Sequence, residues 1–231
     1  MQNKENESIG DKINDFIQRN RKGIFITIIV MVVLFVGILA YLYMGDYFNK
    51  KANAQAEELN TRFTDIQLLK RQGAETSEEE DALLSDLESY IAKTSPITEG
   101  KGFAQGKIWS LAGHLYSNKK DWEKAEEAWL NAVKKGSNTY IGPIALFNAA
   151  VAAEEQGKLD EAITLLEQCV SHKFDFPSAP RAQFNIGRLY EQSGKFDEAL
   201  AAYRVVLTKW PNMPVFQYLA HNQIIKIEPA E

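Results

Sequence analysis

The fold is decided by residues 185–203, which read NIGRLYEQSGKFDEALAAY. Two amphipathic helices meet in this stretch, and Gly194 lies between them. The second helix opens at Ala199 with an apolar stripe at positions i, i+4, i+7 and i+8, and the same stripe opens 37 residues earlier at Ala162 and again at Ala125. A pair of helices cannot bury its apolar face alone, so such pairs must stack on one another. The sequence therefore predicts an all-α solenoid.

The three copies also match at other positions. The stripes of the second helices are Ala125-Trp129-Ala132-Val133, Ala162-Leu166-Cys169-Val170 and Ala199-Tyr203-Val206-Leu207. The first helices carry Gly113 with Tyr116, Ala150 with Ala153, and Gly187 with Tyr190 at matching offsets. We expect the small residue where the two helices cross, because the side chains at the contact set the distance between helix axes.

These residues resemble the tetratricopeptide repeat (TPR) pattern, which has Trp, Leu-Gly and Tyr on a first helix and Ala, an aromatic residue, Ala and Pro from the second onward. The third copy fits it best, with Asn185-Ile186-Gly187, Tyr190, Phe196-Asp197-Glu198-Ala199, Tyr203 and Pro211. The resemblance implies an α-α superhelix of three units at 106–139, 143–176 and 180–213. The family step is about 34 residues, so we place the additional residues of each unit between units, in 134–142 and 171–178.

Turn residues give the ends of these helices. We expect Gly157 and Gly194 to close first helices in the left-handed conformation. We expect Pro211 to stop the last repeat. The next segment, Phe216–Ile225, is predicted to be a capping helix. The residues expected to cover the open end of the solenoid are Phe216, Leu219, Ala220, Gln223 and Ile224.

An apolar segment precedes the repeats. Gly23–Met44 holds no charged residue, and its 22 residues make about 33 Å of helix, which matches the hydrocarbon thickness of a bilayer. A cleavable signal peptide is the competing interpretation, but its apolar core is shorter, and Ala40 is followed here by large residues. Tyr41, Tyr43 and Tyr47 suit an interfacial aromatic belt. We therefore expect a retained transmembrane helix.

Basic residues give the orientation of this helix. Those close to it are Lys12, Arg19, Arg21 and Lys22 before it, and Lys50 and Lys51 after it. The positive-inside rule then predicts a cytoplasmic N-terminus. For a bacterial host, this means one pass through the inner (cytoplasmic) membrane and a periplasmic TPR domain. The expected parts are a cytoplasmic head (1–22), the span (23–44), a membrane-proximal part (45–100) and the TPR units with their cap (101–231).

The membrane-proximal part is predicted to hold two helices. Asp46–Gln72 continues from the span with apolar residues at three- and four-residue steps, and Ser77 with Glu80 forms a capping-box pattern before a helix over Glu78–Lys93. We expect a degenerate hairpin that packs on the first unit. A membrane-proximal coiled-coil dimer through Asp46–Gln72 is the alternative. Pro96–Gly106 is expected to be a boundary loop.

Composition excludes several classes of function. The part after the span has 21 basic and 27 acidic residues, which is a poor footprint for nucleic acid. The single cysteine, Cys169, is expected to be a buried thiol on the inward side of the middle unit. The three histidines, His114, His172 and His221, form no two-histidine helical motif. We expect no catalytic site, no metal and no cofactor.

The partner-binding surface is expected on the concave face, which the first helices line in such stacks. The family positions that point there are Lys107, Ser110, Leu111 and His114, then Phe147, Asn148 and Val151, then Arg181, Phe184, Asn185 and Arg188. We expect Phe147 and Phe184 to offer an apolar ledge flanked by Arg181 and Arg188. A carboxylate clamp known in some TPR domains is matched only at Asn148 and, if Arg replaces Lys, at Arg181.

The layout as a whole resembles YfgM-type proteins, which are single-pass inner-membrane TPR proteins associated with the Sec translocon and periplasmic chaperones. The resemblance implies a membrane-tethered scaffold that binds proteins or peptides and is an accessory to translocation. The alternative is a structural component that self-associates into a homo-oligomer through Asp46–Gln72 and the ends of the solenoid.

Overall fold

The computed structural model describes residues 9–94, 102–174 and 176–228, and over these residues the chain is all-helical, with nine helices and no strand. The chain divides into two compact units, residues 1–47 and 48–231. The first helix, α1 (Ile9–Arg71), contributes to both units, and each unit is described by itself.

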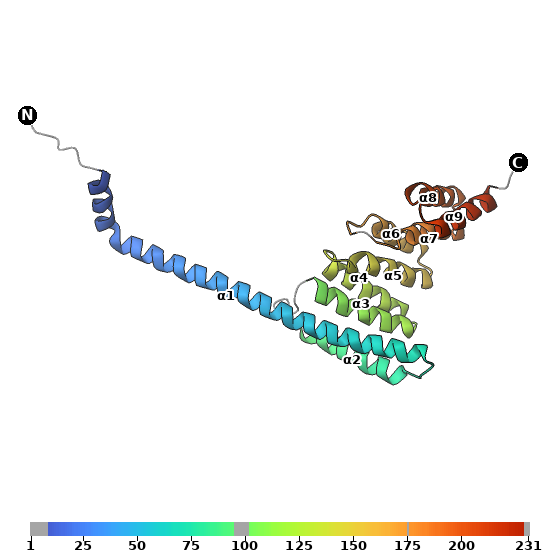
Figure 1. Cartoon of the computed structure of the whole chain (residues 1–231), viewed down its shortest axis with the longest axis horizontal. Helices are drawn as coiled ribbons and strands as arrows, with labels where there is room; N and C mark the ends of the chain where they lie inside the picture. The colour runs from blue at the N-terminus through green and yellow to red at the C-terminus, as the bar shows by residue number, and fades with distance from the viewer. Residues whose placement is uncertain (1–8, 95–101, 175, 229–231) are drawn as a thin grey trace, which may run out of the picture. The chain divides into compact units, whose positions relative to one another are not determined.

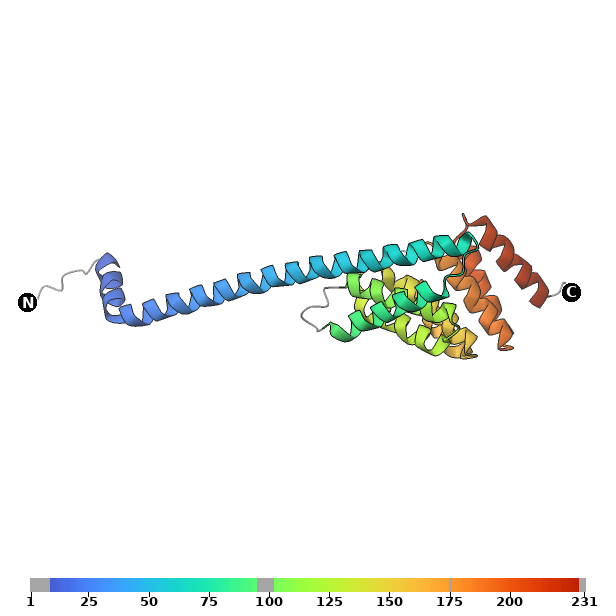
Figure 2. The same cartoon turned by 90° about the horizontal axis from the view of Figure 1, so that it is seen from below.

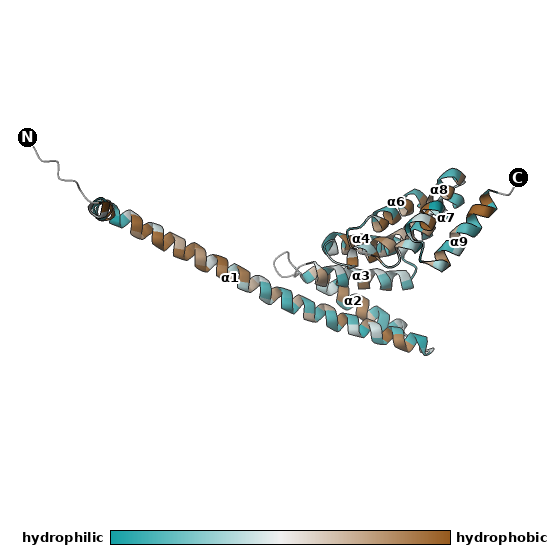
Figure 3. Cartoon of the chain, turned by 45° about the horizontal axis from the view of Figure 1, so that its top comes forward, coloured by the Kyte–Doolittle hydropathy of each residue, from teal (hydrophilic) through white to brown (hydrophobic). Residues whose placement is uncertain are grey.

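In the first unit, α1 is a single helix whose apolar side chains are exposed over almost its whole length. Figure 3 shows the resulting band of hydrophobic residues along α1. By length and composition, this helix could cross a membrane. The predicted span, 23–44, lies within it.

The second unit begins with a helical hairpin. Residues 48–71 of α1 pack through Ala52, Ala56 and Leu59 against α2 (Ser77–Lys93) and against the first repeat helix, in one apolar cluster. This packing uses, within the unit, most of the apolar face that a coiled-coil dimer would need. Leu69, at the end of that face, is exposed.

The predicted capping box at the start of α2 is wrong. Thr76 is the N-cap residue and its side chain makes no capping hydrogen bond, while the first helical N–H, that of Ser77, donates to Glu75 Oε1 at 3.2 Å. Glu80 is buried instead, with Lys70 Nζ at 3.0 Å and Asn118 Nδ2 at 2.8 Å from its carboxylate. The carboxylate of Glu80 is therefore taken up by donors of neighbouring elements and not by a backbone N–H at the start of its own helix.

Three helical hairpins follow and stack in chain order, as Figures 1 and 2 show. They are α3 (Phe103–Asn118) with α4 (Trp122–Gly136), α5 (Ile141–Glu155) with α6 (Leu159–Val170), and α7 (Ala179–Gln192) with α8 (Phe196–Lys209). Ala125, Ala162 and Ala199 are fully buried at equivalent places, as the repeat predicts. One apolar cluster runs from α4 through α5, α6 and α7 to Ala202 of α8, so neighbouring hairpins share a core.

Where the two helices of a hairpin cross, a small residue on the first helix faces a larger residue on the second. A Cβ on Gly113 would lie 2.6 Å from Trp129 Nε1, and a Cβ on Gly187 would lie 2.5 Å from Tyr203 Cε1. In the middle hairpin the corresponding pair is Ala150 with Leu166. Alanine thus replaces glycine on the first helix where leucine replaces the aromatic residue on the second. The crossing requires glycine where the partner is aromatic.

The turns inside the hairpins share one backbone geometry. Gly157 and Gly194 adopt φ values of 76° and 72°, which confirms the prediction for these residues. Lys120 occupies the same place in the first hairpin with φ 58°, a conformation that is energetically unfavourable for any residue with a Cβ. Asp121 N donates to Tyr116 O as Lys195 N donates to Tyr190 O, so the turn hydrogen bonds are kept despite the substitution.

Two predicted boundaries need correction. Helix α3 begins at Phe103, three residues before the expected loop end, and residues 95–101 of that loop lie outside the described part of the chain. Gly106 lies within this helix, and a Cβ there would lie 2.9 Å from Gly136 Cα, so the close approach of α3 and α4 requires glycine.

The last helix, α9 (Pro214–Ile227), begins two residues before and ends two residues after the predicted capping helix. It packs on α8 through Phe216, Ala220 and Ile224, but Leu219 is partly exposed and does not cover the end of the solenoid.

Candidate functional site: a groove beside the first repeat

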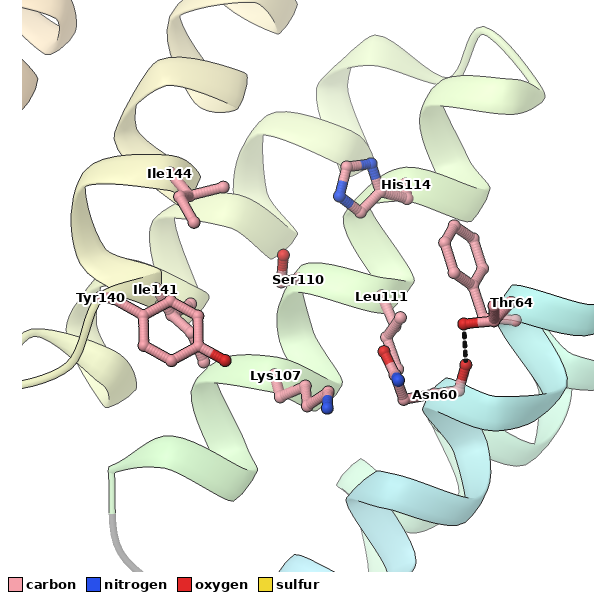
Figure 4. A pocket seen from close by; sticks show the side chains of 10 residues that line it. Asn60, Thr64, Lys107, Ser110, Leu111, His114, Tyr140, Ile141 and Ile144 are labelled. Carbon is pink, nitrogen blue, oxygen red and sulfur yellow. Dashed lines mark hydrogen bonds between the residues drawn. The ribbon is translucent and has the colours of Figure 1, made fainter. Parts of the chain in front are cut away.

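A groove of about 320 Å³ lies where three elements of the second unit approach one another. Residues 60–64 of α1 form one wall, α3 forms the floor, and the start of α5 with Tyr140 forms the other wall. Figure 4 shows the side chains of these three elements around one open space. The lining residues are Asn60, Phe63, Thr64, Lys107, Ser110, Leu111, His114, Tyr140, Ile141 and Ile144.

The groove brings together the residues predicted for the first unit. Lys107, Ser110 and His114 follow one another at three- and four-residue steps, so they share one face of α3. Leu111 lies between them and supplies an apolar floor. This face of α3 is therefore part of an open surface that combines apolar and hydrogen-bonding groups.

The charge of Lys107 is balanced within the groove wall. Its Nζ lies 2.8 Å from Glu57 Oε1 and 5.4 Å from the centre of the Phe103 ring. Thr64 donates its hydroxyl hydrogen to Asn60 O, which fixes the side chain against α1 (Figure 4). The paired lysine leaves the groove without strong net charge, so it is not built to attract a highly charged ligand.

His114 is held between two aromatic rings. Its ring centre lies 5.7 Å from that of Phe63 and 5.5 Å from that of Trp129, the latter edge-on. Burial lowers the pKa of His114 below its ordinary value of 6.5, because the protein interior disfavours the charged form. At neutral pH the imidazole is therefore uncharged, with one nitrogen that donates and one that accepts.

The predicted residues of the middle unit lie further along the stack. Phe147 is only 7% exposed, and its ring packs 5.9 Å from that of Phe176. The guanidinium carbon of Arg181 lies 5.1 Å from the centre of the Phe147 ring, so the guanidinium group also covers this ring. Phe147 is therefore not an exposed ledge. Asn148 and Val151 are partly exposed.

The predicted residues of the third unit also have internal partners. Phe184 packs against Tyr203 at 5.2 Å, and Asn185 is partly exposed. Arg188 forms a two-pronged pair with Glu154 of the preceding unit, at 2.7 and 2.6 Å. Hydrogen bonding to this carboxylate raises the pKa of Arg188. The pair ties α7 to α5, so Arg188 joins two repeats.

The part of the chain that the structure describes holds no group of three or more His, Cys, Asp or Glu residues suited to a metal ion. Cys169 is buried, as predicted, and donates its thiol hydrogen to Pro143 O at 3.1 Å. Burial raises the pKa of this thiol to about 12, so the reactive thiolate is suppressed.

Comparison with known proteins agrees with this architecture. A family model described as a tetratricopeptide repeat-like domain matches residues 14–222, which take in the apolar segment as well as the repeats. The chain belongs to this family. A TPR repeat-containing protein of Treponema pallidum (strain Nichols) is 35% identical over 141 residues, which are 61% of this chain and 57% of the relative. The chain thus spans less than two thirds of that relative.

Solved structures with TPR-like repeats share the fold. The nearly identical TPR-like repeats of a kinesin light chain candidate from Podosopora anserina superpose with a TM-score of 0.57 at 17% identity, over 75% of this chain and 91% of theirs. A variant of those repeats gives a TM-score of 0.56 at 16% identity, over the same shares of the two chains. TPR proteins are in general scaffolds for protein binding.

Sequence reasoning missed two walls of the groove. Asn60, Phe63 and Thr64 belong to the hairpin that lacks the repeat pattern, so no register placed them on the concave side. Ile144 could have been found, because it follows Lys107 by 37 residues and precedes Arg181 by 37.

Proposed function

We propose that this protein is a membrane-tethered scaffold that binds an extended segment of a partner protein in the groove beside the first repeat. The observation that carries the proposal is the groove itself, which three separate elements line. It is open, so a chain segment can lie along it. A TPR domain generally binds other proteins, which fits a surface of this kind.

The lining of the groove favours a segment with apolar side chains and few charges. Phe63, Leu111 and Ile144 offer apolar contacts, while Ser110 and the neutral imidazole of His114 offer hydrogen bonds to a peptide backbone. A newly exported, unfolded chain has such segments. We therefore propose newly translocated chains, or the chaperones that receive them, as the class of partner.

The apolar segment 23–44 determines where in the cell the scaffold would act. We propose that residues 23–44 cross the inner membrane of a bacterium, with the N-terminus in the cytoplasm and the TPR domain in the periplasm. The apolar helix, the basic residues before it and the bacterial relative support this proposal. Confinement near the membrane raises the effective concentration of weak partners, so association with the Sec translocon is part of the proposal.

Affinity purification of the full chain in mild detergent tests the scaffold. Ser110→Trp fills the groove, and Ala201→Trp places the same side chain on an exposed position of α8 as the matched control. Translocation or chaperone components should co-purify with the wild type and the control and be lost from Ser110→Trp. Equal recovery with all three proteins, or recovery of no envelope protein, contradicts the proposal.

A second candidate function is self-assembly, and the outer side of α9 favours it. Val215, Tyr218 and Ile225 are 65%, 68% and 53% exposed, whereas terminal repeats normally present a polar outer side. Two copies could cover these residues by pairing their last helices. Light scattering of the full chain and of Tyr218→Lys in mild detergent decides this, since an identical monomer in both samples removes the candidate.

A further inference from the structure

The first turns of α1 have an apolar stripe of their own, ahead of the predicted span. Ile9, Ile13, Phe16 and Ile17 are exposed, and their spacing of four, three and one residues places them on one side of the helix. Ile17 precedes Gly23, the first residue of the span, by only six residues. The stripe therefore lies close to the point where the chain would enter a membrane.

The other side of these turns is polar. Gln18 lies nine residues after Ile9 and so about 180° around the axis from it. Arg19 pairs with Asp15 at 2.7 Å, and Lys12 lies on the same flank. In Figures 1 and 2 these turns (dark blue) are inclined to the turns of α1 that follow them.

We propose that residues 9–20 form an in-plane amphipathic helix that binds the cytoplasmic surface of the membrane. The apolar stripe lies at the boundary between acyl chains and headgroups, and Lys12 and Arg19 reach the phosphates of anionic phospholipids beside it. Helices with one apolar side and one polar side that carries basic residues lie in the interface rather than across it. The inference rests on the proposed anchor, because the span brings the segment to the surface.

Length and charge select lipid as the partner. At about 1.5 Å per residue, residues 9–20 cannot move more than about 20 Å from the start of the span, so the membrane surface is always within reach. Residues 9–20 carry two basic and two acidic residues, and Arg21 and Lys22, which lie between them and the span, give residues 9–22 an excess of two basic residues. A juxtamembrane excess of basic residues is attracted to anionic lipid. An in-plane helix beside the span would also fix how deeply the span sits.

Site-directed spin labelling of the full chain tests this placement. Cys169→Ala removes the single cysteine, and Phe16→Cys, Gln18→Cys and Leu34→Cys then carry one nitroxide each, in vesicles of phosphatidylcholine with phosphatidylglycerol. Collisions with oxygen report the acyl region, and collisions with a water-soluble nickel chelate report water. Phe16 and Leu34 should favour oxygen, while Gln18 should favour nickel.

The reporter at Leu34 separates this inference from the anchor. Water exposure at Leu34 overturns the span, and with it the inference. Lipid exposure at Leu34 with water exposure at Phe16 overturns the inference alone. Lipid exposure at both Phe16 and Gln18 places these turns inside the bilayer and also overturns it. In vesicles of phosphatidylcholine alone, the oxygen preference at Phe16 should fall, and an unchanged preference overturns the role of anionic headgroups.

Discussion

Gly187→Ala tests whether the small residue at the helix crossing holds the third hairpin together. The new Cβ would lie 2.5 Å from Tyr203 Cε1, 2.7 Å from Cδ1 and 2.9 Å from Cζ. Ordinary carbon contacts are about 3.5–4.0 Å, so the two helices must separate by about 1 Å or the ring must move. Tyr203 is fully buried, and its hydroxyl donates to Glu191 Oε2 at 2.9 Å, which restrains the ring.

The net effect is a difference between two opposing contributions. Alanine favours a helix over glycine by about 0.8–1 kcal/mol, whereas overpacking a core costs about 1–3 kcal/mol. We expect Gly187→Ala to lower the free energy of unfolding by about 0–2 kcal/mol. About 2–4 °C per kcal/mol is usual for a domain of this size, so the melting temperature should fall by up to roughly 8 °C.

Tyr203→Leu provides the matched background, because the middle hairpin pairs Ala150 with Leu166 at the same two places. With Leu at 203, Gly187→Ala should become neutral or stabilising, which gives a coupling of about 1–3 kcal/mol in a double-mutant cycle. Thermal unfolding of the full chain in mild detergent, followed by tryptophan fluorescence, measures all four proteins. If Gly187→Ala stabilises the wild type, or costs the same in both backgrounds, the steric argument is refuted.

Three further predictions concern single residues. Lys120→Gly should stabilise by about 0.5–1 kcal/mol, because glycine adopts φ 58° without steric strain; an unchanged or lower melting temperature contradicts this. The fold lowers the pKa of His114, so the unfolded state binds the proton first and the free energy of unfolding should fall as pH drops below about 6.5. In melting curves measured against pH, His114→Phe should flatten this dependence, and an unaltered slope contradicts the role of His114. Cys169 should resist a thiol-modifying reagent in the native protein and react after denaturation, and rapid native labelling would show that its burial is wrong.

The sequence predicted the repeated core well, for a physical reason. Residues such as Ala125 and Tyr203 are fully buried where the helices pack, and this packing repeats with the 37-residue step. The turn at Lys120 shows the limit of residue type as a signal. Its backbone matches that of Gly157, because the hydrogen bonds of the turn and the stacked helices impose the conformation on a residue that does not prefer it.

The groove was only partly predictable. Lys107, Ser110 and His114 follow from the register of the first repeat. The wall from α1 does not, since a degenerate hairpin carries no repeat pattern. Ion pairs between repeats were also missed, because Arg188 and Glu154 are brought together by the way two hairpins stack and not by any local spacing.

Photocrosslinking in cells tests the central claim, that partners bind in the groove beside the first repeat. A photoreactive amino acid replaces Ile144 in the groove or, as the control, Leu130 on α4, which is outside the groove and 37% exposed. The account predicts adducts with a defined envelope protein from Ile144, absent from Leu130 and suppressed by Ser110→Trp. The same adducts from both positions, or adducts from Ile144 that persist with Ser110→Trp, would contradict it.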